Sequence, residues 1–142
     1  MKRFDEYITS RKIVKRSIEP AEARSLFSQA KERLADLQQL PLNDKSSSFR
    51  YEHAYEVLRE ALQAFIAFDG YKTYSHEAVF AYAFENKLLN ESDTYKADRY
   101  REIRSDINYR GKRVTVDEAK EIIEFIKRIL PQLERIFKER LK

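Results

Sequence analysis

The segment that decides the fold is Thr115–Phe137, which reads TVDEAKEIIEFIKRILPQLERIF. Thr115 and Glu118 form a capping box, in which each side chain accepts a hydrogen bond from the other residue's backbone N–H. Apolar residues then recur at helical spacing, at Ala119, Ile122, Ile126, Ile129, Leu130, Leu133, Ile136 and Phe137. Because this pattern continues beyond Pro131, we expect the proline to kink one long helix rather than end it.

Cap and turn residues divide the rest of the chain into five more predicted helices. The first three cover about residues 3–15, 20–40 and 49–68. The fourth begins after the cap Ser75, and the fifth covers about residues 93–109. The expected boundaries are a first-turn proline at Pro20, closing glycines at Gly70 and Gly111, and a capping stretch that begins at Asn90. The fourth helix is apolar over a wide arc and is therefore expected to be central.

The composition favours an all-α protein. Two glycines and three prolines leave little material for β-turns. The absence of cysteine excludes a disulfide scaffold, and no apolar run approaches the roughly 20 residues that span a membrane. We predict an up-down helical bundle of five to six helices, forming a single domain over residues 1–142, cytoplasmic and without a membrane partner.

Positive charge is concentrated locally. The chain has 28 basic and 24 acidic residues, but residues 99–113 carry six bases and two acids. This stretch holds Arg101, Arg104, Arg110, Lys112 and Arg113 around the end of a helix. Such a density predicts binding of a phosphate-bearing ligand, either RNA or a nucleotide. The competing interpretation is a solvated helix face, or arginines that pair with Glu102, Asp106 or a neighbouring helix.

A helical wheel separates the residues of this stretch. The buried stripe consists of Tyr100, Ile103 and Ile107. Arg104 falls at the edge of the stripe, and Arg101 and Asn108 fall on the same flank. Two planar guanidiniums and an amide are therefore expected at the rim of the core, where they match the oxygens of a phosphate.

The two histidines, His53 and His76, do not form a metal-binding pattern. We expect no metal and no cofactor. His76 follows the predicted cap Ser75, and a helix N-terminus lowers the basicity of a histidine. A structural role is the default interpretation of His76, since no spacing places it beside a serine or Arg104.

Two groups of motifs resemble the HEPN superfamily over about residues 20–135. The first is Arg104-Ser105-x-x-x-Tyr109-x-Gly111 followed by Val114-Thr115-x-x-Glu118-Ala119, and the second is Gly70-Tyr71-Lys72-x-Tyr74-Ser75-His76-Glu77-Ala78. The resemblance implies a dimeric helical bundle. It also implies a small nucleotidyltransferase as partner and a role in a toxin–antitoxin or defence system. In the family, an arginine and a following histidine mark a ribonuclease site, usually at a dimer interface.

Tyr109 stands where the family has its histidine, while Arg104 matches the family's arginine. A phenol, with a pKa of about 10, transfers protons poorly at neutral pH. We therefore expect nucleotide or RNA binding by a non-catalytic or weakly active protein. In this role Arg104 clamps phosphate, Arg101 and Asn108 support it, and Tyr109 stacks or donates a hydrogen bond. An active metal-independent ribonuclease toxin and a structural dimeric adaptor without a ligand site remain the alternatives.

The spacing of Arg104 and Tyr109 favours a homodimer. Five residues along a helix correspond to a rotation of about 140°, so the two side chains diverge within one subunit unless the helix ends first. A two-fold axis brings the same patch of both subunits together, which allows the two residues to meet.

Overall fold

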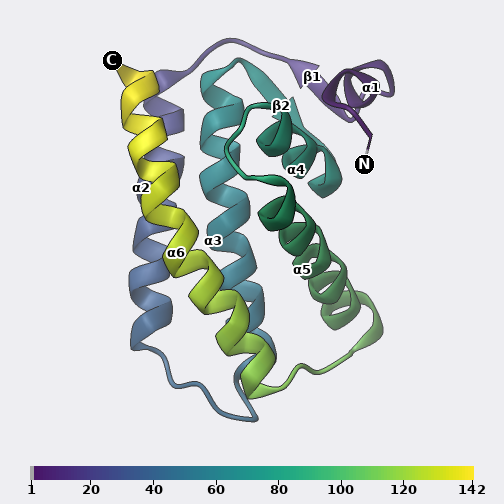
Figure 1. Cartoon of the computed structure of the whole chain (residues 1–142), viewed down its shortest axis with the longest axis vertical. Coiled ribbons are helices and arrows are strands. Elements are labelled where there is room, and N and C mark those ends of the chain that lie inside the picture. The colour runs from purple at the N-terminus through teal and green to yellow at the C-terminus, as the bar shows by residue number, and fades with distance from the viewer. Residues whose placement is uncertain (1) are drawn as a thin grey trace.

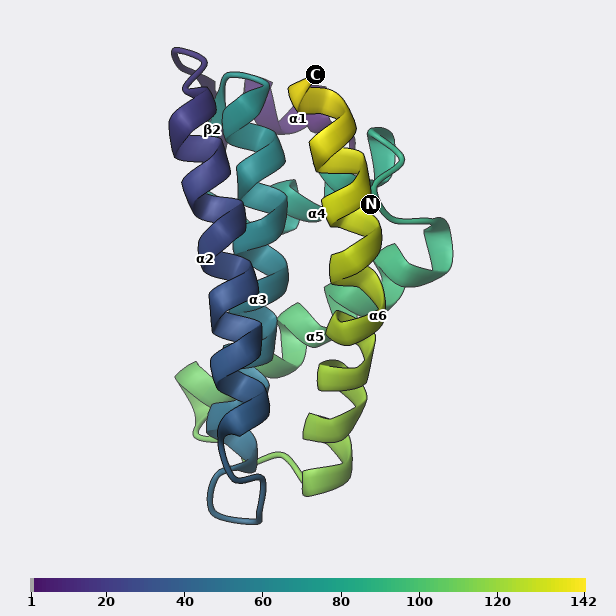
Figure 2. The same cartoon turned by 90° about the vertical axis from the view of Figure 1, so that its left-hand side faces the viewer.

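Three long helices form the body of the protein. The computed structural model describes residues 2–142. Helix α2 (Pro20–Gln39) runs antiparallel to α3 (Ser47–Phe68), and α6 (Val116–Leu141) runs parallel to α3 (Figures 1 and 2). The mostly helical arrangement confirms the predicted all-α class.

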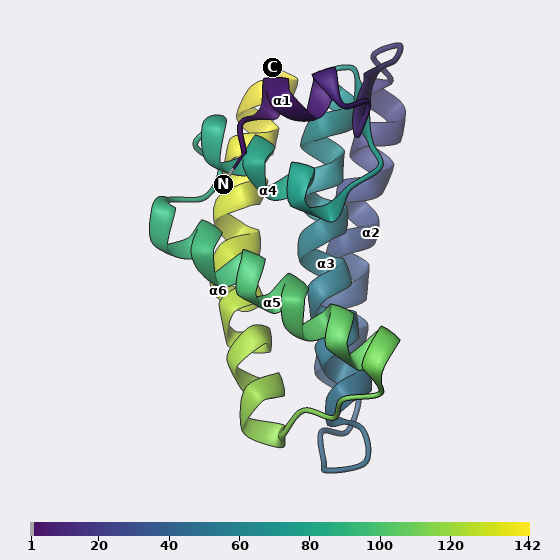
Figure 3. The ribbon, with the colours of Figure 1, turned by 90° about the vertical axis from the view of Figure 1, so that its right-hand side faces the viewer.

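Helices α4 and α5 cover the side of α3 that faces away from α2 (Figure 3). Helix α4 (His76–Glu85) packs against α3, and α5 (Glu91–Arg110) crosses obliquely over α3 and α6 (Figure 3). All of Ala78–Ala83 is buried in α4, as its apolar arc predicts. The helix at the centre of the bundle is nevertheless α3, because it contacts α2, α4, α5 and α6.

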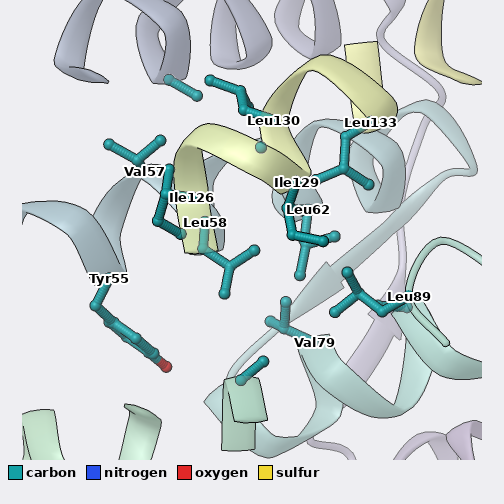
Figure 4. Close-up of a cluster of buried hydrophobic side chains, with 14 of the residues drawn as sticks. Tyr55, Val57, Leu58, Leu62, Val79, Leu89, Ile126, Ile129, Leu130 and Leu133 are labelled. Carbon is teal, nitrogen blue, oxygen red and sulfur yellow. The ribbon is translucent and has the colours of Figure 1, made fainter. Parts of the chain in front are cut away.

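The main core lies between α3 and α6. Figure 4 shows Leu58 and Leu62 of α3 facing Ile126 and Ile129 of α6, while Tyr55 lies at the edge of this cluster. The hydroxyl of Tyr55 points away from the aliphatic side chains. This direction matters because helix α4 begins on that side of α3 and helix α5 crosses α3 there.

The cap residues define the helix ends as the sequence predicts. In the capping box of α6, Glu118 N donates to Thr115 Oγ1 and Thr115 N donates to Glu118 Oε1, both at 3.1 Å. Helix α6 continues through Pro131 to Leu141. Asn90 caps α5 by accepting from Asp93 N at 2.7 Å, and Gly111 ends it with a φ of +65°.

The predicted helix over residues 3–15 is wrong in its second half. The helix α1 ends after Phe4–Thr9, and Arg11 adopts a left-handed φ of +62°, which a right-handed helix cannot contain. Residues Ile13–Lys15 instead form the strand β1, which pairs antiparallel with β2 (Tyr71–Thr73). Two β-branched residues in β1 suit this extended conformation. The partner strand comes from a distant part of the chain, so the short-range pattern does not reveal the pairing.

The small sheet positions the start of α4. Tyr74 N donates to Lys12 O at 2.6 Å, and Ser75 then caps α4 by accepting from Ala78 N at 3.4 Å. Gly70 precedes β2 with a φ of +83°, and an added Cβ would lie 3.0 Å from Ile18 Cγ1. The turn before β2 therefore requires glycine, both for its backbone conformation and for space. As a result, His76 is held at a fixed place beside α5.

Within residues 2–142, none of the helices combines the length and the apolar character needed to cross a membrane.

Candidate functional site

A shallow pocket of about 190 Å³ lies between the start of α4 and the second half of α5. Its walls are formed by His76, Glu77, Arg101, Arg104, Ser105 and Tyr109. We call this set the Arg104 pocket. Arg101, Arg104 and Tyr109 were predicted as site residues, whereas His76 and Glu77 come from a different helix and were not.

Arg104 is held in place by the ring of Tyr55 and the amide of Asn108. Its Cζ lies 5.8 Å from the centroid of the Tyr55 ring, a cation–π distance. With the Asn108 amide oriented to match its neighbours, its oxygen accepts from Arg104 Nε at 2.9 Å and from Nη2 at 3.2 Å. The same amide donates to Glu52 Oε1. Asn108 therefore bridges Arg104 to Glu52 of α3.

Two carboxylates of the neighbouring helices accompany the arginines. Glu56 Oε1 lies 4.0 Å from Arg104 Nη2, and Glu77 Oε1 lies 3.8 Å from Arg101 Nη1. Arg101 also donates from Nε to Asp98 Oδ1 at 2.9 Å. The alternative of arginines paired with a neighbouring helix is thus partly realised. Each guanidinium carries five N–H groups, however, and these contacts leave some of them available.

The unused donors can be identified. Among hydrogen bonds to residues 2–142, Arg101 uses only Nε, and Arg104 uses Nε and Nη2. About a fifth to a quarter of each side chain is exposed, 21% for Arg101 and 24% for Arg104. Both residues can therefore offer N–H groups to an anion while their carboxylate partners keep them in place.

Glu56 is the most strongly held of these carboxylates. Its burial disfavours the charged form, but hydrogen bonds from Arg59 and the charge of Arg104 outweigh this effect and lower the pKa of Glu56. The shortest of these hydrogen bonds, from Arg59 Nη2 to Glu56 Oε2, measures 2.7 Å. Glu56 therefore stays ionised and pairs with both Arg59 and Arg104.

His76 contacts Tyr55 through both its edge and its face. The Tyr55 hydroxyl lies 2.9 Å from His76 Nδ1, and the two rings stack at 5.7 Å with an interplanar angle of 17°. Burial lowers the pKa of His76, and the charges of Arg59 and Arg104 lower it further. The lowered basicity agrees with the prediction, but its main physical cause is burial rather than the helix N-terminus.

Tyr109 is 80% exposed and lines the same pocket as Arg104 within one chain. The expected divergence of these two side chains is therefore wrong. Helix α5 ends one residue after Tyr109, and both side chains line the pocket that His76 and Glu77 of α4 also line. The two residues share a pocket within one chain, so their spacing does not by itself require a dimer.

The remaining predicted basic residues lie outside the pocket. Arg110, Lys112 and Arg113 are exposed in the last turn of α5 and the connection to α6. Arg110 Nε lies 3.7 Å from Asp106 Oδ1. These residues do not line the Arg104 pocket, and they add positive charge to the surface next to Tyr109.

Sequence reasoning missed the contribution of α3. Four residues on one face of this helix build the surroundings of the site: Tyr55 contacts His76 and Arg104, and Glu56 pairs with Arg104. Behind them, Glu52 accepts from Asn108 and Arg59 donates to Glu56. Their spacing of three and four residues is visible in the sequence. Nothing in that spacing shows that this face lies against α5 rather than solvent, because that depends on the crossing of the two helices.

A larger hollow of about 500 Å³ lies elsewhere, between the end of α4 and the start of α5. Phe84 and Tyr95 contribute its aromatic wall, with Lys2, Arg3, Glu85, Glu91 and Thr94 around them. It lacks the convergent arginines of the smaller pocket, so size alone does not identify the functional site.

Over residues 2–142, no group of three or more histidine, aspartate or glutamate side chains is placed to hold a metal ion. Comparisons with known proteins do not name the site either: no family model, curated protein or solved structure shows significant similarity to the chain. Functional inference therefore depends on the geometry of the Arg104 pocket.

Proposed function

We propose that this protein binds RNA or a nucleotide through a phosphate group held in the Arg104 pocket. The observation that carries the proposal is that Arg101, Arg104 and Tyr109 line one pocket. Two guanidiniums with free N–H groups suit phosphate oxygens, and an exposed ring beside them suits a base. Glu77 lines the same pocket and lowers its positive potential, so we expect moderate affinity.

The proposed roles follow from these positions. Arg104 clamps the phosphate, Arg101 provides a second cation, and Asn108 holds Arg104 in orientation. Tyr109 stacks on the base. Arg110, Lys112 and Arg113 attract the rest of a nucleic acid without touching the clamped phosphate.

The biological setting is proposed from the HEPN-like motifs. We place the protein in the cytoplasm as a homodimeric, HEPN-like component of a nucleotidyltransferase-linked toxin–antitoxin or defence system. The helical bundle and the site at Arg104 support this setting. An affinity-purified complex that contains a small nucleotidyltransferase would support the partner assignment, and its consistent absence would count against it.

A second candidate is the active metal-independent ribonuclease. The observation that favours it is the presence of His76 in the Arg104 pocket, where an imidazole replaces the one missing from position 109. Incubation of the purified protein with RNA tests this candidate. Cleavage that disappears in Arg104→Ala would establish the enzyme.

A third candidate is the structural adaptor, favoured by the carboxylates beside both arginines. Here the arginines stabilise the contact between α3, α4 and α5 and bind no ligand. This candidate predicts that the unmodified protein binds neither RNA nor nucleotide. It also predicts that Arg104→Ala lowers the unfolding free energy.

Fluorescence anisotropy with a labelled single-stranded RNA at low salt tests the proposed function. We expect Arg104→Ala to weaken binding at least about tenfold, because hydrogen bonds to a charged group are lost. The slope of log affinity against log salt should also decrease by about 0.7, the value for one phosphate contact on a single strand. Glu77→Gln should tighten binding.

The matched control is Arg99→Ala. Arg99 belongs to the same helix, is exposed and pairs with Glu102 at 3.3 Å, but does not line the pocket. Circular dichroism verifies that each variant is folded. Equal affinities of the two alanine variants would contradict the proposed role of Arg104. No binding of RNA or nucleotide by the unmodified protein would contradict the proposed function and favour the structural adaptor.

A further inference from the structure

We propose that Tyr55 fixes His76 in the tautomer that carries its proton on Nε2, so that His76 donates a hydrogen bond to a phosphate oxygen in the Arg104 pocket. The ligand role deepens the proposed function and rests on it. Tyr55 is then a positioning residue that acts through His76. His76 itself is a determinant of ligand recognition rather than a proton acceptor.

The buried hydroxyl of Tyr55 determines the tautomer of His76. The residue is 0% exposed, and the only hydrogen-bond partner of its hydroxyl within residues 2–142 is His76 Nδ1, at 2.9 Å. A buried O–H that makes no hydrogen bond costs free energy. The hydroxyl therefore donates to Nδ1, which must present a lone pair. A neutral imidazole has one N–H, and that proton is then on Nε2.

The groups that face the imidazole keep it neutral. Helix α3 contributes Tyr55, Glu56 and Arg59, and α5 contributes Arg101 and Arg104. Burial and the three arginines lower the pKa of His76. Glu56 has the opposite effect, but it is too small to offset them. Burial also raises the pKa of Tyr55, which keeps its hydroxyl protonated. Glu77, the following residue on α4, has its side chain 56% exposed.

This tautomer has a direct chemical consequence. With a proton on Nε2, neutral His76 has no lone pair on that nitrogen with which to remove a proton from a substrate hydroxyl. It is instead a donor, as are the guanidiniums of Arg101 and Arg104 and the hydroxyl of Ser105 in the same pocket. Phosphate oxygens are acceptors, so this donor set matches a terminal phosphate monoester or a bridging phosphodiester.

A titration without ligand tests the Tyr55 contact. The pKa of His76 is measured by NMR from its imidazole Cε1–H signal in the unmodified protein and in Tyr55→Phe. If Tyr55 donates to neutral His76, its removal destabilises the neutral form and the pKa of His76 rises. An unchanged or lower pKa would overturn the tautomer assignment. The signal of His53, which is exposed on α3 with Nδ1 3.3 Å from Arg50 Nη1, is the internal control and should be the same in both proteins.

A binding experiment at pH 7.5 tests the role toward ligand. Uridine monophosphate and the dinucleotide UpU are titrated into the protein, and their affinities are measured by calorimetry. Tighter binding of uridine monophosphate indicates a site for a terminal phosphate, and tighter binding of UpU indicates a site for a bridging phosphate. We expect His76→Ala to weaken binding about tenfold. His76→Gln, which keeps an N–H donor, should recover most of this loss, and His53→Ala should have no effect.

The outcomes separate the two proposals. Unchanged binding in His76→Ala, or equal losses in His76→Ala and His76→Gln, would overturn the donor role of His76. Failure of the unmodified protein to bind RNA or either nucleotide would overturn the proposed function. In that case the titration of Tyr55→Phe still decides whether Tyr55 sets the tautomer.

Discussion

At the scale of single residues, the site is a set of side chains whose partners come from three helices. Arg104 of α5 rests against Tyr55 of α3, which in turn contacts His76 of α4. The helical wheel places Arg104 at the rim of the core, and its side chain is indeed 24% exposed. The partners were not predictable in the same way, because the wheel describes one helix and gives no information about the helix packed against it.

Tyr109 provides a test at this scale. Its exposed ring beside the Arg104 pocket should stack on a base, so Tyr109→Ala is expected to weaken binding of single-stranded RNA about tenfold. The unfolding free energy of the monomeric chain should change by less than about 0.5 kcal/mol, as is usual for an exposed position. Anisotropy and urea unfolding measure the two quantities.

Tyr95 is the matched control for this prediction. It lies on the same helix and is 79% exposed, compared with 80% for Tyr109, but it lines the other hollow. Tyr95→Ala should leave RNA affinity unchanged. A similar loss in both variants would indicate a general effect of exposed tyrosines and would contradict a specific role of Tyr109.

At the scale of elements, the helix ends that are set by local hydrogen bonds were predictable from the sequence. The end of α1 was not, because the segment after it pairs with a distant strand. Asn90, Gly111 and Thr115 cap or close their helices because the required groups lie within a few residues. Residues 13–15 are strand rather than helix because their hydrogen-bond partners are residues 71–73.

The capping box of α6 leads to a stability prediction. Thr115→Ala removes the acceptor for Glu118 N, and it should lower the unfolding free energy by about 1 kcal/mol. Urea denaturation measures this loss. Thr115→Ser keeps a hydroxyl and should retain most of the stability. Equal destabilisation by serine and alanine would show that the methyl group of Thr115, rather than its hydroxyl, is responsible.

At the scale of the whole molecule, helices α2 to α6 bury one main core, and a minor cluster lies under α1 and β1. The order of predicted helices was sufficient for the all-α class. It was not sufficient to identify α3 as the central helix, because centrality depends on how many neighbours cover a helix.

The proposed homodimer is tested by sedimentation velocity over a range of protein concentrations. We expect a dimer through the face that bears Arg104 and Tyr109. Tyr109→Arg adds like charge to this basic face on both subunits, and should weaken dimerisation about tenfold. Tyr95→Arg is the control and should remain dimeric. A monomer at all concentrations would contradict the dimer and leave the Arg104 pocket as a site within one chain.

By itself, the sequence determined the helical class, most helix boundaries and the basic character of the end of α5. These features follow from apolar periodicity, capping residues and local charge, all of which act over a few residues. Only the tertiary structure decided that Tyr55, His76 and Arg104 meet, and that Tyr109 shares their pocket. The physical reason is that their proximity depends on how α5 crosses α3 and on how the β1–β2 pair positions the start of α4. Both are long-range arrangements that no local pattern encodes.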